Sequence, residues 1–174
     1  MSDSFAHHLR LDRITDGERI DLSADDSERK AVAERLGLET LDRLDAHATL
    51  YRTKDVIRAE GRLAAALDQR CVVTGEPVAA HVDEAFEILF MPEPQVARAD
   101  EEIELAATDC DVVFHDGSTI DLGAAIADTL ALGLDPYPRS AGAAVALKEA
   151  GVVDESAAGP FAALAQLKRG RDET

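Results

Sequence analysis

Apolar and polar residues alternate along the first half of the chain, a pattern typical of strands with one buried face. Residues 44–50 alternate cleanly, and residues 56–67 follow them across the turn Thr53-Lys54-Asp55. Residues 78–90 alternate again after the turn Gly75-Glu76-Pro77. Because strands joined by short turns pair antiparallel, these stretches predict a meander of three or more strands.

Two further stretches predict strands near the ends of this meander. His8–Ile14 and Arg19–Ala24 alternate on either side of Asp16-Gly17, a dipeptide favoured in hairpin turns, so we expect them to pair with each other. Cys110–His115 predicts another short strand, which the Asp116-Gly117 turn ends.

A helix is predicted after the second alternating stretch. Asp25, Asp26 and Ser27 offer N-caps for a helix through Leu36, with Val32 and Leu36 inward. Gly37 follows as a plausible C-terminal glycine.

A second helix is predicted within Thr119–Arg139, with Asp121 as its N-cap. Its apolar stripe is Leu122, Ile126, Leu130 and Leu134, with Ala125, Thr129 and Leu132 beside it. Asp135-Pro136 ends the helix, because the residue before a proline avoids the α region.

The remaining segments predict less regular structure. We expect residues 92–109 to form an acidic loop, and residues 140–159 to form a small-residue-rich, partly mobile segment. Residues 160–174 predict a short helix and a basic tail. The whole is an α+β fold in a single domain over 1–174: an antiparallel β meander, which could close into a barrel, with two to three helices.

The formal net charge of −17 is unevenly distributed along the chain. Between Arg70 and Pro138 two basic residues stand against fifteen acidic ones, whereas Ser27–Arg62 is close to neutral. Phosphate backbones are bound mainly by lysine and arginine, so this composition counts against broad, direct binding of nucleic acid. The acidity either serves solubility alone or provides a face for a basic partner.

Two observations on the sequence indicate the cellular compartment of the protein. No apolar run approaches the length that a bilayer requires, and the N-terminal stretch lacks the features of a secretory signal. We therefore expect a cytoplasmic protein that does not bind membranes. In a reducing compartment, Cys71 and Cys110 are expected to be free thiols.

No motif indicates an enzyme, a cofactor or a metal site. The chain lacks a nucleophile elbow and a phosphate-binding glycine loop. His47 and His81 are expected on the polar face of the strands. Cys71 is either a small buried residue at the end of a strand or, as an alternative, a metal-binding or redox thiol. We expect no catalytic residue and no cofactor.

Three stretches resemble one known family. QRCVVTGEPV (69–78) is similar to the centre of the YceD-like family, the large ribosomal RNA subunit accumulation proteins. The sequence from Ile120 to Ala143 resembles the second block of the proteobacterial branch, and GPFAALAQLK resembles the closing motif. The residues that carry these motifs are Cys71, Thr74, Glu76, Pro77, Asp121, Leu122, Phe161 and Leu164.

The resemblance implies a non-enzymatic ribosome biogenesis factor that supports accumulation and processing of large-subunit ribosomal RNA. Some relatives carry a second Cys three positions after the first. Thr74 occupies that position here, so a Cys-x-x-Cys site does not transfer to this chain.

The charge favours a protein partner for such a factor. We expect an acidic face to bind a ribosomal protein or a large-subunit assembly factor, so that ribosomal RNA is contacted indirectly or weakly. The alternative is direct RNA binding by the basic C-terminal tail, through Lys168, Arg169 and Arg171, with Arg139 or the mixed face around Arg52, Lys54 and Arg58 as further candidates.

The rigid loop Asp135-Pro136-Tyr137-Pro138-Arg139 is the candidate partner-binding segment. It joins an aromatic side chain to a cation just where the acidic region ends. The alternative is a stiff end to the helix, with Tyr137 packed against the core.

Overall fold

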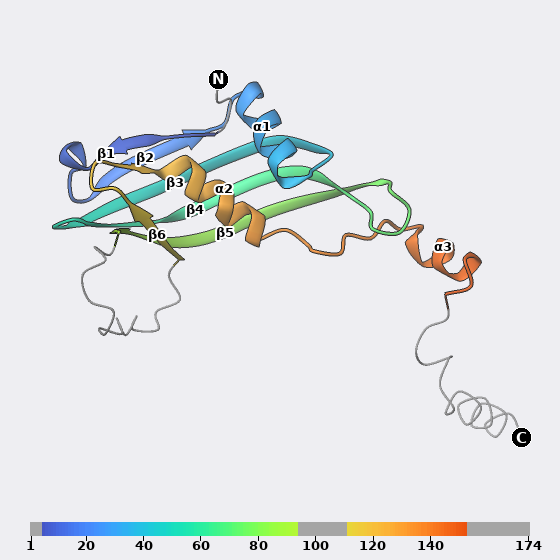
Figure 1. Cartoon of the computed structure of the whole chain (residues 1–174). Coiled ribbons are helices and arrows are strands. Elements are labelled where there is room, and N and C mark those ends of the chain that lie inside the picture. The colour runs from blue at the N-terminus through green and yellow to red at the C-terminus, as the bar shows by residue number, and fades with distance from the viewer. Residues whose placement is uncertain (1–4, 94–110, 153–174) are drawn as a thin grey trace, which may run out of the picture. The chain divides into compact units, whose positions relative to one another are not determined.

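The computed structural model describes residues 5–93 and 111–152 of the chain (Figure 1). The elements are β1 (His8–Arg10), a 3₁₀ turn (Leu11–Arg13), β2 (Glu18–Ser23), α1 (Asp26–Leu36), β3 (Thr40–Thr53), β4 (Val56–Arg70), β5 (Pro77–Pro92), β6 (Asp111–His115), β7 (Thr119–Asp121), α2 (Leu122–Leu132) and α3 (Ala143–Glu149). The fold class is α+β, as the sequence predicts.

The chain divides into two compact units. The first unit comprises Met1–Gln69 and Ala79–Pro136, and the second comprises Arg70–Val78 and Tyr137–Thr174. The first holds the sheets with α1 and α2, and the second holds α3. That the whole chain acts as a single domain stays a prediction.

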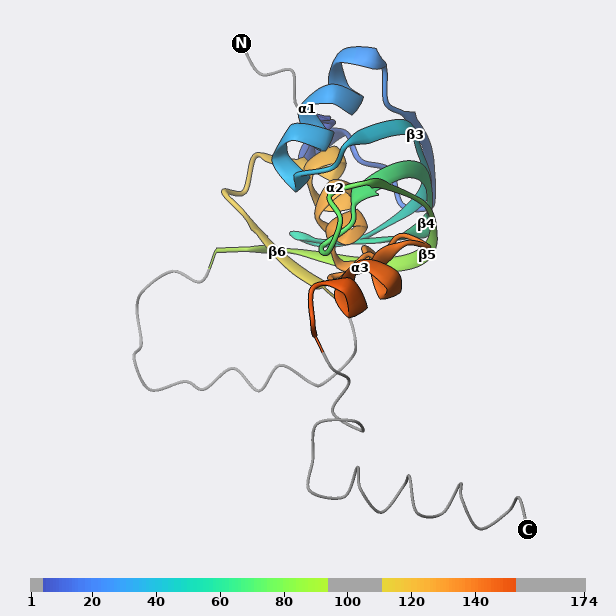
Figure 2. The same cartoon turned by 90° about the vertical axis from the view of Figure 1, so that its right-hand side faces the viewer.

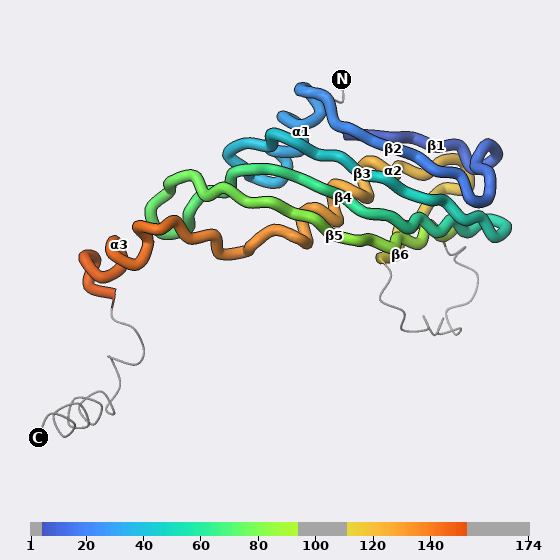
Figure 3. The backbone as a smooth tube through the Cα atoms, turned by 180° about the vertical axis from the view of Figure 1, so that it is seen from behind, coloured from blue at the N-terminus to red at the C-terminus, as the bar shows by residue number. Residues whose placement is uncertain are grey.

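The five-stranded sheet has the order β2-β3-β4-β5-β6, and Figure 3 shows these strands in succession. The predicted pairing of β3 with β4 is confirmed: Thr53 lies opposite Val56, and Lys54 in the turn has a positive φ of 56°. In the part of the chain that the structure describes, β2 and β6 are edge strands, so the sheet is open and does not close into the barrel that the sequence leaves possible.

Strand alternation places the core on one face of this sheet. Even-numbered residues of β3 from Leu44 to Leu50 and most odd-numbered residues of β4 are buried, among them Leu44, Leu50, Ile57 and Leu63. Both helices of the first unit lie on this side of the sheet (Figure 2). The opposite face, called the outer face below, carries the polar residues of each strand, because successive side chains point to opposite sides.

Helix α2 supplies the largest helical contribution to the core. Leu122, Ile126 and Leu130 are each 0% exposed, which corresponds to about 1.5–3 kcal/mol per side chain. The predicted N-cap is confirmed, since the Asp121 carboxylate accepts a hydrogen bond from the Ala124 N–H at 3.0 Å. Leu132 departs from the prediction: it is 75% exposed, because it points away from the stripe.

Helix α1 forms as predicted. Asp25 caps it by accepting hydrogen bonds from the backbone of Ser27 and Glu28, and the Glu28 carboxylate accepts from the Asp25 N–H at 2.9 Å. Gly37 ends the helix with a φ of 67°, a conformation that glycine adopts without strain. Val32 is 2% exposed and anchors the helix to the core.

The predicted hairpin between the first two strands is wrong. Strand β1 pairs with β7, where His8 lies opposite Asp121, and β2 pairs with β3. Leu11 and Ile14 are buried between these strands, so the chain turns inward after Arg10 instead of returning along itself. The turn at Asp16-Gly17 does form, since the Glu18 N–H donates to the Thr15 carbonyl oxygen at 3.1 Å and Gly17 has a φ of 78°, but it does not pair β1 with β2.

Two other expectations need correction. Strand β6 pairs with β5 in parallel, with Ile88 opposite Asp111, so the sheet is mixed and not a pure meander. The long connection before β6 makes this possible, since parallel neighbours need a crossover. The segment 140–159 was expected to be irregular, yet it contains α3, whose Ala143 is 2% exposed.

Candidate partner-binding surfaces

The boundary between the two units falls inside the loop Asp135–Arg139. In the first unit, Gln69 donates from Nε2 to the Asp135 carbonyl oxygen at 2.8 Å, and Pro136 is exposed. In the second unit, the Pro138 carbonyl oxygen accepts from the Val72 N–H at 2.9 Å, and Pro138 is buried. Both ends of the loop are thus fixed by hydrogen bonds within their own unit.

The side chains of this loop differ in exposure. Tyr137 is 70% exposed, and Arg139 is exposed as well. Packing of Tyr137 against the core, the alternative to docking, is therefore not found. The arrangement provides an aromatic ring and a guanidinium on the surface of the second unit. Partner binding by the loop stays a prediction.

Cys71 lies in the second unit and is 3% exposed. Its sulfur accepts hydrogen bonds from three backbone N–H groups, those of Val73 and Thr74 at 3.4 Å and that of Ser140 at 3.2 Å. Burial raises the pKa of the thiol, but hydrogen bonds from Ser140 and Thr74 outweigh burial and lower the pKa to about 6. The small buried residue expected at this strand end is thus also an acidic thiol.

Thr74 and Glu76 complete the surroundings of this thiol. The Thr74 hydroxyl donates to the Glu76 carboxylate at 2.9 Å and lies 3.1 Å from the Ser140 hydroxyl. Hydrogen bonds from Ser140 and Thr74 lower the pKa of Glu76. Thr74 therefore serves as a hydrogen-bonding residue where a second Cys would be needed for a metal. Among the described residues, no three His, Cys, Asp or Glu side chains are grouped so that they could hold a metal ion.

Pro77 and the residues of the second family motif, Asp121 and Leu122, have structural roles. Pro77 begins β5, and Leu122 begins α2 in the core. Asp121 caps α2 and also accepts from the His7 N–H at 2.9 Å, which ties the N-terminal segment to this helix. Phe161, Leu164, Lys168, Arg169 and Arg171 lie outside the described residues.

The acidic residues between Arg70 and Pro138 do not share one face. On the outer face of the sheet, Asp83 pairs with Arg62, and Glu87 pairs with Arg58. On the helical side, Asp128 of α2 pairs with Arg35 of α1. The negative charge is therefore a property of the whole first unit, and part of it is balanced locally.

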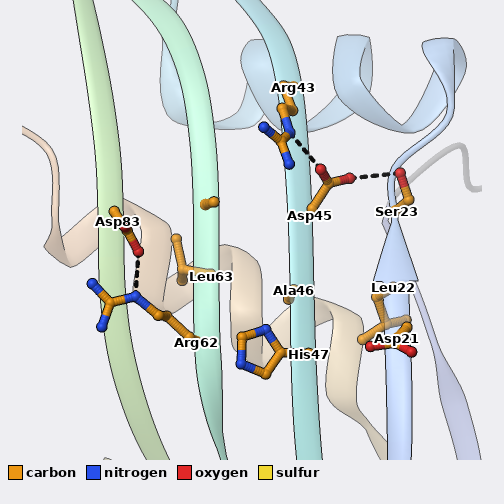
Figure 4. Close-up of a pocket in the computed structure, with 11 residues that line it drawn as sticks. Asp21, Leu22, Ser23, Arg43, Asp45, Ala46, His47, Arg62, Leu63 and Asp83 are labelled. Carbon is orange, nitrogen blue, oxygen red and sulfur yellow. Dashed lines mark hydrogen bonds and ion pairs between the residues drawn. The ribbon is translucent and has the colours of Figure 1, made fainter.

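The outer face carries a shallow groove of about 460 Å³ over β2 to β5 (Figure 4). Arg62 bonds to Asp83 on one side of the groove, while Asp45 accepts from both Ser23 and Arg43 on the other. Hydrogen bonds from Ser23 and Arg43 lower the pKa of Asp45, so this carboxylate is charged at neutral pH. Arg62 and Arg43 already pair with carboxylates. The groove therefore offers no cluster of unpaired arginines that could bind phosphate.

The face of mixed charge around Arg52, Lys54 and Arg58, a candidate for RNA binding, also carries arginines that already have partners. The Arg58 guanidinium lies 4.9 Å from the centre of the Tyr51 ring and pairs with Glu60. Arg52 donates to the carbonyl oxygens of Leu11 and Lys54. Both guanidinium groups are therefore engaged in contacts within the first unit.

Sequence patterns missed the burial of His115. His47 and His81 are exposed as predicted, but His115 is 5% exposed. Its Nδ1 accepts from the Gly117 N–H at 3.0 Å, so Nε2 carries the proton and donates to the Asp55 carbonyl oxygen at 2.9 Å. His115 thus joins the turn after β3 to the end of β6. Its position in an alternating strand, in phase with Val113, was the available signal.

Taken together, fold and surfaces define an α+β protein with one helix-covered and one exposed sheet face. None of the described helices is both long enough and apolar enough to cross a bilayer. The family model of the large ribosomal RNA subunit accumulation protein YceD matches residues 59–168, more than half of the chain. The chain belongs to this family. In comparisons with curated proteins and with solved structures, no match is found.

Proposed function

We propose that this protein is a non-enzymatic, cytoplasmic ribosome biogenesis factor. It supports accumulation and processing of large-subunit ribosomal RNA by binding a basic protein, either a ribosomal protein or a large-subunit assembly factor. The family supports the role in ribosomal RNA accumulation. The choice of a protein partner rests on the charge of the first unit.

The net charge belongs entirely to the first unit. That unit contains 12 basic and 29 acidic residues, whereas the second contains six of each. A surface of this charge repels phosphate within a Debye length of roughly 8 Å at physiological salt. The same surface attracts lysine-rich and arginine-rich proteins and accelerates their association. RNA is then affected through the protein that is bound.

Affinity purification from lysate, with and without nuclease, tests the proposal. Ribosomal proteins or assembly factors should stay bound after the RNA has been digested, and crosslinks should map to the first unit. Loss of every such partner after nuclease treatment would contradict direct binding to a protein partner.

Direct RNA binding by the second unit is the competing function. Its balanced charge and the exposed Tyr137 and Arg139 make it the more suitable unit for RNA. This function predicts that affinity for pre-ribosomal RNA falls steeply with salt and is lost when residues 168–174 are removed. Equal RNA binding by the truncated and the intact chain would exclude the tail.

A further inference from the structure

Strand β6 is an edge strand of the sheet that the described residues form. The His115 carbonyl oxygen accepts from the Glu93 N–H at 3.1 Å, so the polar backbone groups of His115 face β5. In a strand, consecutive residues direct these groups to opposite sides. Val113 therefore also faces β5, whereas the N–H and C=O groups of Val112 and Phe114 point away from it. Among the described residues, no strand pairs with that side of β6.

Apolar side chains lie beside this edge on the outer face of the sheet. Val113 packs against the core, so Val112 and Phe114 point to the opposite face. The register places Val112 beside Leu89 and Phe114 beside Met91. Phe114 is 53% exposed, and the other three are partly exposed. These four residues, Leu89, Met91, Val112 and Phe114, are called the β6 patch below.

Acidic residues lie at both ends of β6 and beside it. The stretch 99–138, which contains β6, has no lysine and no arginine. Asp111 and Asp116 are exposed at the two ends of the strand, and Glu93 is exposed beside it. Hydrogen bonds from the Ser118 hydroxyl and N–H lower the pKa of Asp116, so this carboxylate stays charged well below neutral pH.

We propose that the edge of β6 binds an extended, lysine- or arginine-bearing segment of the protein partner, which adds to the sheet as a further strand. The inference rests on the proposed function and specifies where the partner docks. Backbone hydrogen bonds to Val112 and Phe114 supply affinity in this mode of recognition, and the β6 patch takes apolar side chains of the segment. The carboxylates around the edge select basic residues and disfavour RNA.

An array of overlapping peptides from the large-subunit ribosomal proteins, tested with the full chain, provides the probe. Basic peptides should bind, and versions with Glu in place of Lys and Arg should not. With the best binder, hydrogen exchange of the Val112 and Phe114 amides should slow. Val112→Pro should weaken binding about tenfold or more, because it removes an N–H that makes no bond to β5.

Two variants separate docking from folding. Phe114→Ser removes an exposed side chain of the β6 patch and should weaken the peptide while the melting temperature stays close to that of the wild type. Leu132→Ser is the matched control, since Leu132 is 75% exposed on α2 of the same unit, and it should leave binding unchanged. If Val112→Pro fails to fold, Phe114→Ser and the exchange data decide.

The possible outcomes are distinct. Binding of basic peptides with protection elsewhere overturns the inference and leaves the proposed function standing. Binding of RNA but of no basic peptide overturns both. Slower exchange at Val112 and Phe114 that depends only on protein concentration identifies a second copy of this chain as the occupant, which also overturns the inference.

Discussion

Gly61 of β4 lies where another strand and an aromatic ring leave no room for a side chain. A Cβ at this position would stand 2.0 Å from the His47 carbonyl oxygen and 2.7 Å from the Phe86 ring. We expect Gly61→Ala to lower the free energy of unfolding by about 2–4 kcal/mol, measured by urea denaturation. Adding Phe86→Leu should not restore stability, because the backbone contact remains. Wild-type stability of Gly61→Ala would contradict this packing.

Cys71 should make stability depend on pH. Its pKa in the folded protein is about 6, below the ordinary value of 9.0, so folding favours the thiolate. The contribution is fully present above about pH 9 and is lost as the pH falls through about 6. The free energy of unfolding of the wild type, relative to Cys71→Ala, should therefore rise between these pH values. A constant difference would show that the thiol is not stabilised as an anion.

At the scale of elements, local signals specified the helices better than the strand pairing. The capping residues Asp25 and Asp121 stand beside the backbone groups that they satisfy, so a few neighbouring residues suffice to predict them. No neighbouring residue indicates the partner of strand β1, because that partner, β7, lies more than a hundred residues away in sequence. The parallel pairing of β6 with β5 has a different cause: alternation within a strand does not specify the direction of its neighbour.

The cap of α1 gives a prediction at this scale. Asp25→Ala should lower the free energy of unfolding by about 1 kcal/mol, since two backbone N–H groups of α1 lose their acceptor. Asp25→Asn keeps an acceptor and should change stability little. Thermal and urea denaturation of both variants provide the measurement. Equal effects of the two variants would point to the charge of Asp25 and not to capping.

At the scale of the molecule, the two units differ in charge. This difference distinguishes binding of a basic protein by the acidic first unit from binding through the loop of the second unit. Tyr137 and Arg139 belong to the other, balanced unit, and both are exposed. Replacing both by Ala should leave the melting temperature within about 1–2 °C of the wild type, as expected for surface positions. If the loop docks a partner, recovery of that partner in affinity purification should fall.

The double variant also discriminates between alternatives. A marked drop in melting temperature would show that Tyr137 and Arg139 stabilise the fold. Unchanged stability with unchanged partner recovery would exclude the loop and leave the first unit as the binding region. Variants of the β6 patch, tested alongside, show whether both regions contribute.

The sequence by itself determined the α+β class, the two capped helices, the β3–β4 pair and the family. Each depends on neighbouring residues or on motifs that are continuous in the chain. Only the tertiary structure decided that β1 joins β7, that the acidic residues are spread over several faces, and that backbone N–H groups surround the Cys71 thiol. The loop Asp135–Arg139 depends on both. Its two prolines, visible in the sequence, restrict its backbone, whereas the exposure of Tyr137 depends on how the chain packs.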